Sequence, residues 1–141
     1  MTQTFAADIA KFSAKVQRRA THILRAAAQD VISEAQTVKG NGGRMPIDTG
    51  NLRASLGVSL RGNTALTGAE AYVAALGSAE AGDTIRVAWR TAYAARMEFG
   101  FVGTDRAGRR FNQPGNLFAS TAISKWQDQV LKFARQAESI A

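Results

Sequence analysis

The chain has 141 residues with 18 Lys and Arg against 11 Asp and Glu, a net charge of +7, and no cysteine. Without cysteine the protein has no disulfide, thiolate nucleophile or cysteine-held metal. No apolar run approaches the ~20 residues of a membrane helix, and the first residues lack the apolar core of a secretion signal. The sequence therefore predicts a single domain over residues 1–141, made in the cytoplasm and without a membrane partner.

The basic residues are spread over the whole chain and do not form one block. A basic chain can bind nucleic acid, an anionic surface or an acidic partner subunit. No recognised nucleic-acid motif accompanies these charges, so solvated surface charge is the simpler interpretation for most of them. A basic nucleic-acid-binding module remains the alternative function.

Apolar residues at steps of three and four predict one long helix over about residues 4–39. We expect Gly40 to cap its C-terminus in the left-handed conformation and Lys39 to complement the helix dipole. Such a helix is longer than a domain of this size covers, so part of its apolar stripe should pack on another element or on a neighbouring subunit. The stripe consists of Phe5, Ile9, Phe12, Val16, Ala20, Ile23, Ala27, Val31 and, after a gap of seven residues, Val38.

The sequence PIDTGNLRASL, residues 46–56, predicts a sharply defined corner between a helix and a strand. Pro46 fixes its own backbone torsion. Asp48 is expected to cap a short helix by accepting hydrogen bonds from the amides that follow it. The residues assigned to this architectural turn are Pro46, Asp48, Thr49, Gly50, Leu52, Arg53 and Ser55.

Alternating apolar and polar side chains predict two strands beyond this corner. We expect the short helix to end at Gly57, a first strand to begin at Val58 and a second strand to cover residues 84–90. Residues 63–83, between them, fit either a helix or a third strand. A further short helix over residues 92–99 completes a region of sheet and short helices spanning about residues 46–100.

Residues 101–115 are rich in Gly and Arg and are predicted to form a surface loop. Apolar spacing then predicts a second long helix over about residues 116–140, with Pro114 just ahead of its start. The predicted fold class is therefore α+β: a small antiparallel sheet packed against two long helices, N-terminal and C-terminal, with one or more short helices between them.

Few residues suggest catalytic chemistry. The one histidine, His22, lies among arginines in the predicted N-terminal helix and has no second ligand at a metal-binding spacing. Glu98 is a candidate buried acid, but no carboxylate lies near it in the sequence for two-carboxylate hydrolysis. The sequence therefore predicts no enzymatic activity, no catalytic or metal-binding residues and no cofactor.

The predicted loop over residues 101–115 combines aromatic and basic side chains in a pattern that suggests a contact surface. Interleaved aromatic and basic residues can stack on single-stranded nucleic acid. Alternatively, the aromatics anchor the loop while the arginines bind carboxylates of an adjacent subunit. The sequence does not distinguish a contact with a neighbouring subunit from a contact with DNA. The residues proposed for it are Arg106, Arg109, Arg110 and Phe111.

Two segments together resemble the neck or tail-completion proteins of long-tailed bacteriophages, which are minor tail components. Those proteins typically show a Pro-x-Asp-Thr-Gly-x-Leu-x-x-Ser turn, a strand pair, a Tyr-Ala-x-x-x-Glu-Tyr/Phe-Gly segment and an aromatic-bearing C-terminal helix. The turn described above matches the first pattern, and Phe118, Ala122 and Trp126 fit the last element. The second pattern is matched by Tyr93, Ala94, Glu98, Phe99 and Gly100.

The resemblance spans about residues 44–130 and implies a structural protein of the virion, made in the host cytoplasm and placed at the head–tail junction. It implies a homo-oligomeric ring that adjoins a head-connector protein on one side and a tail-tube or tail-terminator protein on the other. Such a ring can also touch passing DNA transiently. A ring protein has to hold its subunits at a fixed angle, and the capped corner at residues 46–56 would help to set that angle.

Overall fold

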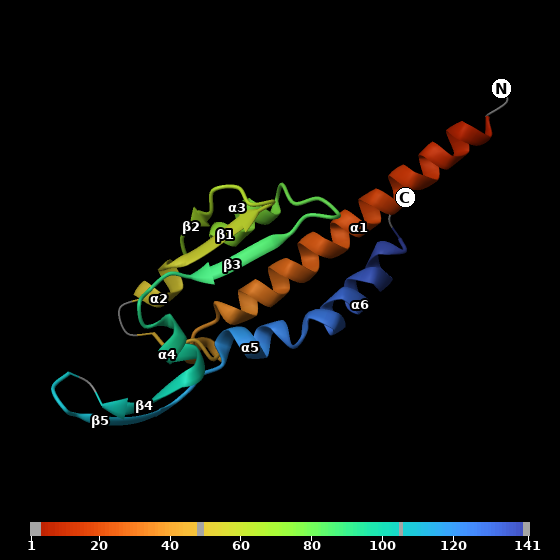
Figure 1. Ribbon diagram of the computed structural model, residues 1–141. Coiled ribbons are helices and arrows are strands. Elements are labelled where there is room, and N and C mark those ends of the chain that lie inside the picture. Colours follow the sequence, from red (N-terminus) through yellow and green to blue (C-terminus); the bar gives the residue numbers. More distant parts are fainter. Residues whose placement is uncertain (1–3, 48–49, 105, 140–141) are drawn as a thin grey trace.

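The computed structural model describes residues 4–47, 50–104 and 106–139 of the chain. It confirms an α+β fold in which a small antiparallel sheet packs against long helical segments from both ends of the chain (Figure 1). The molecule is elongated. The N-terminal half of helix α1 (Phe5–Ala35) projects at one end, and a β-hairpin projects at the other.

Helix α1 begins after Thr4, whose hydroxyl accepts a hydrogen bond from the Ala7 amide at 3.1 Å. It ends at Ala35, earlier than the predicted end near residue 39, and Gly40 is not its cap. A separate 3-10 helix η1 (Lys39–Asn41) follows. The reason is tertiary pairing: the chain at Val38 bridges to Met45, which is fully buried, and continuing the helix would prevent this contact.

The three-stranded sheet has the order β2-β1-β3, with all pairs antiparallel. Its strands are β1 (Leu56–Leu60), β2 (Leu66–Thr67) and β3 (Ile85–Trp89). The predicted second strand is confirmed. The first strand begins at Leu56, before Gly57, because the preceding helix α2 (Asn51–Ala54) lasts only one turn. An extended chain from Leu56 turns alternate apolar side chains into the core.

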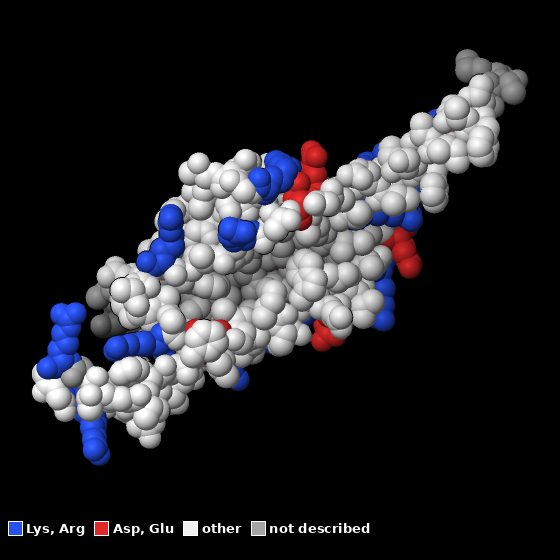
Figure 2. All heavy atoms as spheres, in the orientation of Figure 1, with Lys and Arg blue, Asp and Glu red and all other residues white. Residues whose placement is uncertain are grey.

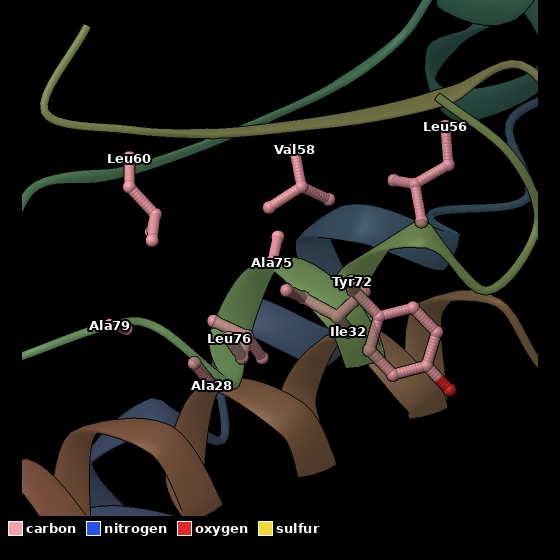
Figure 3. Packing of buried hydrophobic residues seen from close by; sticks show 9 residues of the cluster. All are labelled: Ala28, Ile32, Leu56, Val58, Leu60, Tyr72, Ala75, Leu76 and Ala79. Carbon is pink, nitrogen blue, oxygen red and sulfur yellow. The ribbon is translucent and has the colours of Figure 1, made fainter. Parts of the chain in front are cut away.

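The main core lies between β1, α1 and the short helix α3 (Ala71–Leu76), as Figure 3 shows. Leu56, Val58 and Leu60 of β1 point at Ile32 of α1 and at Leu76 of α3. Each such side chain stabilises the fold by roughly 1.5–3 kcal/mol when fully buried. The sequence of residues 63–83 fitted either a helix or a strand, and the structure shows both there: the short strand β2 and the helix α3.

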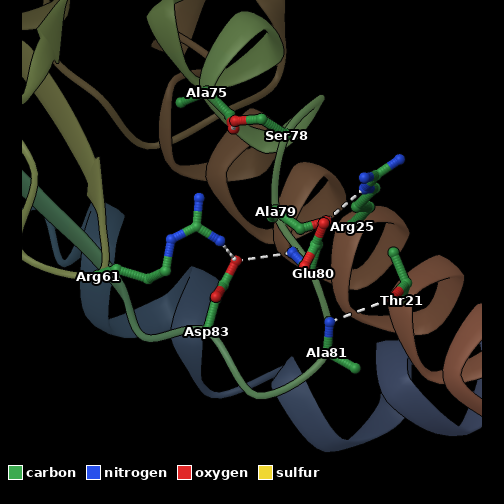
Figure 4. Close-up of polar contacts among 9 residues, drawn as sticks. All are labelled: Thr21, Arg25, Arg61, Ala75, Ser78, Ala79, Glu80, Ala81 and Asp83. Atoms are coloured by element: carbon green, nitrogen blue, oxygen red, sulfur yellow. Dashed lines mark hydrogen bonds and ion pairs between the residues drawn. The ribbon is translucent and has the colours of Figure 1, made fainter.

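Polar contacts tie the connection between α3 and β3 to its surroundings (Figure 4). The Arg25 side chain of α1 donates to the carbonyl of Ala79 at 2.6 Å. The Asp83 carboxylate accepts from the Glu80 amide and from Arg61, both at 2.7 Å. The Glu80 amide, and after it the Arg61 guanidinium, hold the pKa of Asp83 below its usual value. These bonds fix the position at which β3 begins.

The prediction that residues 101–115 form a loop is wrong. After helix α4 (Ala94–Phe99), the chain forms a two-stranded hairpin of β4 (Gly100–Thr104) and β5 (Arg110–Pro114). Five residue pairs hold it in register, from Gly100 opposite Pro114 to Thr104 opposite Arg110. Glycine content suggested a loop, but Gly103 lies within a strand next to the Phe101 ring, where an added Cβ would lie 3.0 Å from a ring carbon.

The prediction of one undivided C-terminal helix over residues 116–140 is also wrong. Within the described residues it is two helices, α5 (Phe118–Ile123) and α6 (Trp126–Ala137), separated by a turn. At this turn the Ser124 hydroxyl donates to the Thr121 carbonyl, in competition with the helical backbone. The turn lets α5 pack near the end of α1 while α6 runs alongside its middle (Figure 1).

Candidate functional site

The two sequence segments that carry the family resemblance meet in space. They line a pocket of about 380 Å³, with Leu52 and Gly50 contributed by the first segment and Tyr93 and Met97 by the second. Leu52 is buried beneath the pocket in a cluster with Met45 and Phe118. The turn and the second segment therefore form one junction between the sheet, α4 and α5.

The described residues of the first segment have distinct backbone and side-chain positions. Gly50 precedes α2 with φ at +82°, a left-handed conformation that favours glycine. The Ser55 hydroxyl donates to the Leu52 carbonyl at 2.7 Å and accepts from the Arg90 amide at 3.1 Å. Asp48 and Thr49 lie outside the described residues, so the capping role assigned to Asp48 stays a prediction.

Gln36, at the end of α1, joins this junction through its buried side chain. Its amide nitrogen donates to the carbonyls of Arg53 and Ala69 at 2.9 and 2.8 Å, and its carbonyl oxygen accepts from the Trp89 indole at 2.8 Å. The Arg53 side chain donates in return to the Gln36 main-chain carbonyl at 3.1 Å. Our sequence analysis did not identify Gln36, since a polar residue at a helix end carries no distinctive signal.

Glu98, in the second segment, is buried, and its carboxylate caps helix α5. It accepts hydrogen bonds from the Ala119 amide at 3.0 Å and from the Ser120 amide and hydroxyl at 2.7 and 2.6 Å. A carboxylate at a helix N-terminus satisfies amides that have no partner within the helix and complements the helix dipole. The buried acid therefore has an architectural contact that accounts for its burial.

Gly100 and Gly115 allow the two ends of the hairpin to approach closely. A Cβ atom added to Gly100 would lie 2.4 Å from the Gln113 carbonyl oxygen, and one added to Gly115 would lie 2.5 Å from the Glu98 carbonyl oxygen. Gly100 also has φ at +83°. In the same segment, Ala94 starts α4, whereas the Phe99 side chain is 73% exposed and points away from the core.

The four residues proposed for a subunit or DNA contact all lie on the hairpin or at its turn. Arg110 and Phe111 belong to β5, and Arg106 and Arg109 are exposed residues between the strands. The hairpin forms a surface at the end of the molecule opposite to the N-terminus of α1 (Figure 1). Basic side chains point outward from this end in different directions (Figure 2).

The opposite end carries an apolar surface on the projecting half of α1. Phe5 is 81% exposed and Phe12 is 66% exposed, and both Ile9 and Val16 are about half exposed. We call these four residues the exposed stripe. At helical spacing the stripe leads into Ala20, Ile23 and Ala27, which lie in the part of α1 that α6 accompanies. The exposed stripe is thus the uncovered continuation of an internal helix–helix interface.

Other chemistry is sparse among the residues that the structure describes. His22 makes an edge-to-face contact with Phe133, with ring centres 6.2 Å apart. Over residues 4–47, 50–104 and 106–139, no group of three acidic or histidine side chains could hold a metal ion. The described helices include none that is both long and apolar enough to cross a lipid bilayer.

A family model with the description "Bacteriophage HK97-gp10, putative tail-component" matches residues 3–100, which is well over half of the chain. The class of protein is therefore that of structural components of bacteriophage tails. The chain belongs to this HK97-gp10-like family, and it is accordingly a protein of the virion. No curated protein and no solved structure matches it. The match includes α1, the sheet and α4, and it ends where the hairpin begins.

Proposed function

We propose that the protein is a subunit of a ring at the head–tail junction, joining the tail tube to the head connector. The observation that carries this proposal is the exposed stripe on α1, which presents two phenylalanines and two aliphatic side chains to solvent. Monomeric proteins rarely expose contiguous apolar surface of this kind without a binding partner. A neighbouring copy that covers the stripe completes the interface that α6 begins.

A ring accounts for the shape of the molecule better than a two-fold dimer does. The two ends differ: one carries the exposed stripe of α1, and the other is the hairpin with its exposed arginines (Figures 1 and 2). A contact between unlike surfaces repeats head-to-tail, and it produces a closed ring when the rotation between subunits closes.

The buried area limits what the stripe contributes. Covering one large apolar side chain stabilises a complex by roughly 1.5–3 kcal/mol before the cost of association. That cost is on the order of 4–15 kcal/mol, which is comparable to what four partly exposed side chains supply. We therefore expect the ring contact to include other parts of each subunit. The faces left over in the ring are available to the head-connector protein and to the tail-tube or tail-terminator protein.

The experiment replaces both phenylalanines of the stripe, Phe5→Ser with Phe12→Ser, and measures the mass of the purified protein and the joining of heads to tails. The matched control is Val73→Ser, which removes a half-exposed apolar side chain from α3 on the body. We expect the double variant to fold with the parent's helical content but to remain monomeric and to leave heads and tails separate. The control should assemble and join normally.

Two results would contradict the proposal. The first is a double variant that still forms the parent oligomer and joins heads to tails. The second is a position away from the head-proximal end of the tail when the protein is labelled in purified virions. Localisation tests the head–tail junction independently of the stripe, so the ring contact and the site of action can fail separately.

A further inference from the structure

Two aromatic rings of the hairpin, each with a guanidinium group beside it, form a row that begins at Arg96 of α4. The guanidinium carbon of Arg96 lies 4.0 Å from the centre of the Phe101 ring. The Phe101 and Phe111 rings are 6.2 Å apart, and the Arg109 guanidinium carbon lies 5.9 Å from the centre of the Phe111 ring. The row therefore crosses both strands and ends in a guanidinium group on each side.

Basic charge is present beyond this row as well. Arg110 is paired with Thr104 across the hairpin, and both side chains are exposed, as is Arg106 near the turn. Residues 100–115 contain three arginines and one acid, Asp105, which lies outside the described residues. The nearest acid in sequence before the hairpin, Glu98, is buried in the cap of α5. The hairpin end of the molecule is therefore basic.

These features fit a nucleic-acid duplex better than an acidic protein partner. A strand pair that docks on a protein normally buries one face, but in this hairpin exposed cations or aromatics occur on both faces. A two-stranded ribbon is also narrow enough to enter the major groove of DNA, between its phosphate backbones. A guanidinium that lies over an aromatic ring, as that of Arg96 does, can still donate hydrogen bonds to phosphate oxygens.

We propose that the hairpin over residues 100–114 binds the phosphate backbone of double-stranded DNA without sequence preference. The arginines supply the phosphate contacts, and the row through Phe101 and Phe111 orients two of the guanidinium groups. This binding uses a surface separate from the exposed stripe, and it belongs to the free subunit as well as to any assembly. Its failure would therefore leave the ring proposal standing, and the failure of the ring would leave DNA binding testable.

The test measures binding of the purified full chain to a fluorescent DNA duplex of about 30 base pairs over a range of salt concentrations. The hairpin variant combines Arg106→Gln, Arg109→Gln and Arg110→Gln. The matched control removes three arginines elsewhere, by Arg86→Gln, Arg90→Gln and Arg135→Gln, all at exposed positions. Both variants carry the same net charge, so they differ only in where the charge was removed.

We expect the parent to bind the duplex and the hairpin variant to bind at least tenfold more weakly at low salt. For duplex DNA, each lost phosphate contact reduces the slope of log affinity against log salt by about 0.9, so the hairpin variant should lose up to about 2.7 from its slope. The charge control should keep a slope near that of the parent. A triple replacement of the same hairpin arginines by lysine should also keep it, which separates charge from folding.

Three outcomes would overturn the proposal. One is a parent protein that does not bind duplex DNA at low salt, and another is an equal loss in the hairpin variant and the charge control. The third is a hairpin variant that keeps the parent salt slope but no longer joins heads to tails. That last result would assign the hairpin to a protein partner.

Discussion

At the scale of single residues, two buried polar side chains hold the junction together. Glu98 caps α5 from a different helix, and Gln36 joins the end of α1 to the corner and to β3. Each makes three side-chain hydrogen bonds to groups distant in sequence. A buried polar group is costly unless it is paired, so such residues favour one arrangement of the elements over others.

Glu98→Gln should destabilise the protein by about 1–3 kcal/mol, the range for losing hydrogen bonds to a charged group. The glutamine side chain keeps one acceptor oxygen, but its NH₂ group would face a backbone N–H or hydroxyl of α5, so two donors would meet without an acceptor. Denaturant unfolding can follow this through Trp89, which packs edge-to-face on Phe118 of α5 with ring centres 5.0 Å apart. The control Glu70→Gln alters a largely exposed carboxylate and should change stability by less than about 0.5 kcal/mol. Equal midpoints for the two variants would show that the cap contributes nothing.

Residue contacts of this kind were only partly predictable. The sequence indicated that Glu98 was a candidate buried acid, because it lies beside Tyr93 and Phe99. Its partners Ala119 and Ser120 are more than twenty positions away, and no local pattern connects them. Gln36 was missed for the same reason: its role depends on which backbone carbonyls the fold brings to it.

At the scale of elements, periodicity predicted the types of most segments but not their ends. The long N-terminal helix, the strand at residues 85–89 and the short helix α4 were all predicted in type. Three errors came from packing: α1 ends early to let Val38 meet Met45, the C-terminal helix divides to follow α1, and the expected loop is a hairpin. In the hairpin, glycine serves close approach as well as turning, and composition alone does not separate these roles.

Gly100→Ala should destabilise the protein by about 1–3 kcal/mol, since the new Cβ would clash with the Gln113 carbonyl and the residue has a positive φ. Gly40→Ala is the matched control, because nothing lies within 4 Å of an added Cβ there and its φ is not in the left-handed region. Thermal unfolding of both variants checks the prediction. A Gly100→Ala protein as stable as Gly40→Ala would mean that the base of the hairpin adjusts freely.

At the scale of the whole molecule, α1 runs through the body, and the two ends present different surfaces, the exposed stripe and the hairpin. The sequence predicted an N-terminal helix too long for one domain to cover, and the structure shows where it is uncovered: from Phe5 to Val16. The sequence did not predict that the basic segment would stand at the far end. That arrangement follows from the path of α4 and the hairpin, which only the complete fold determines.

Helix α1 continues without interruption from the sheet to the exposed stripe, so in the proposed ring it would set the angle between the body and a neighbouring subunit. Its 31 residues span about 46 Å at ~1.5 Å per residue, and the buried and exposed parts of the stripe share one angular phase. One alanine inserted after Gln17 turns the exposed stripe by about 100° relative to the body, whereas four inserted residues turn it by only about 40° beyond a full revolution. Assembly measured by native mass should therefore fail with one extra residue and recover substantially with four. If assembly depended on the number of inserted residues and not on the rotation that they cause, the proposed contact through the exposed stripe would be wrong.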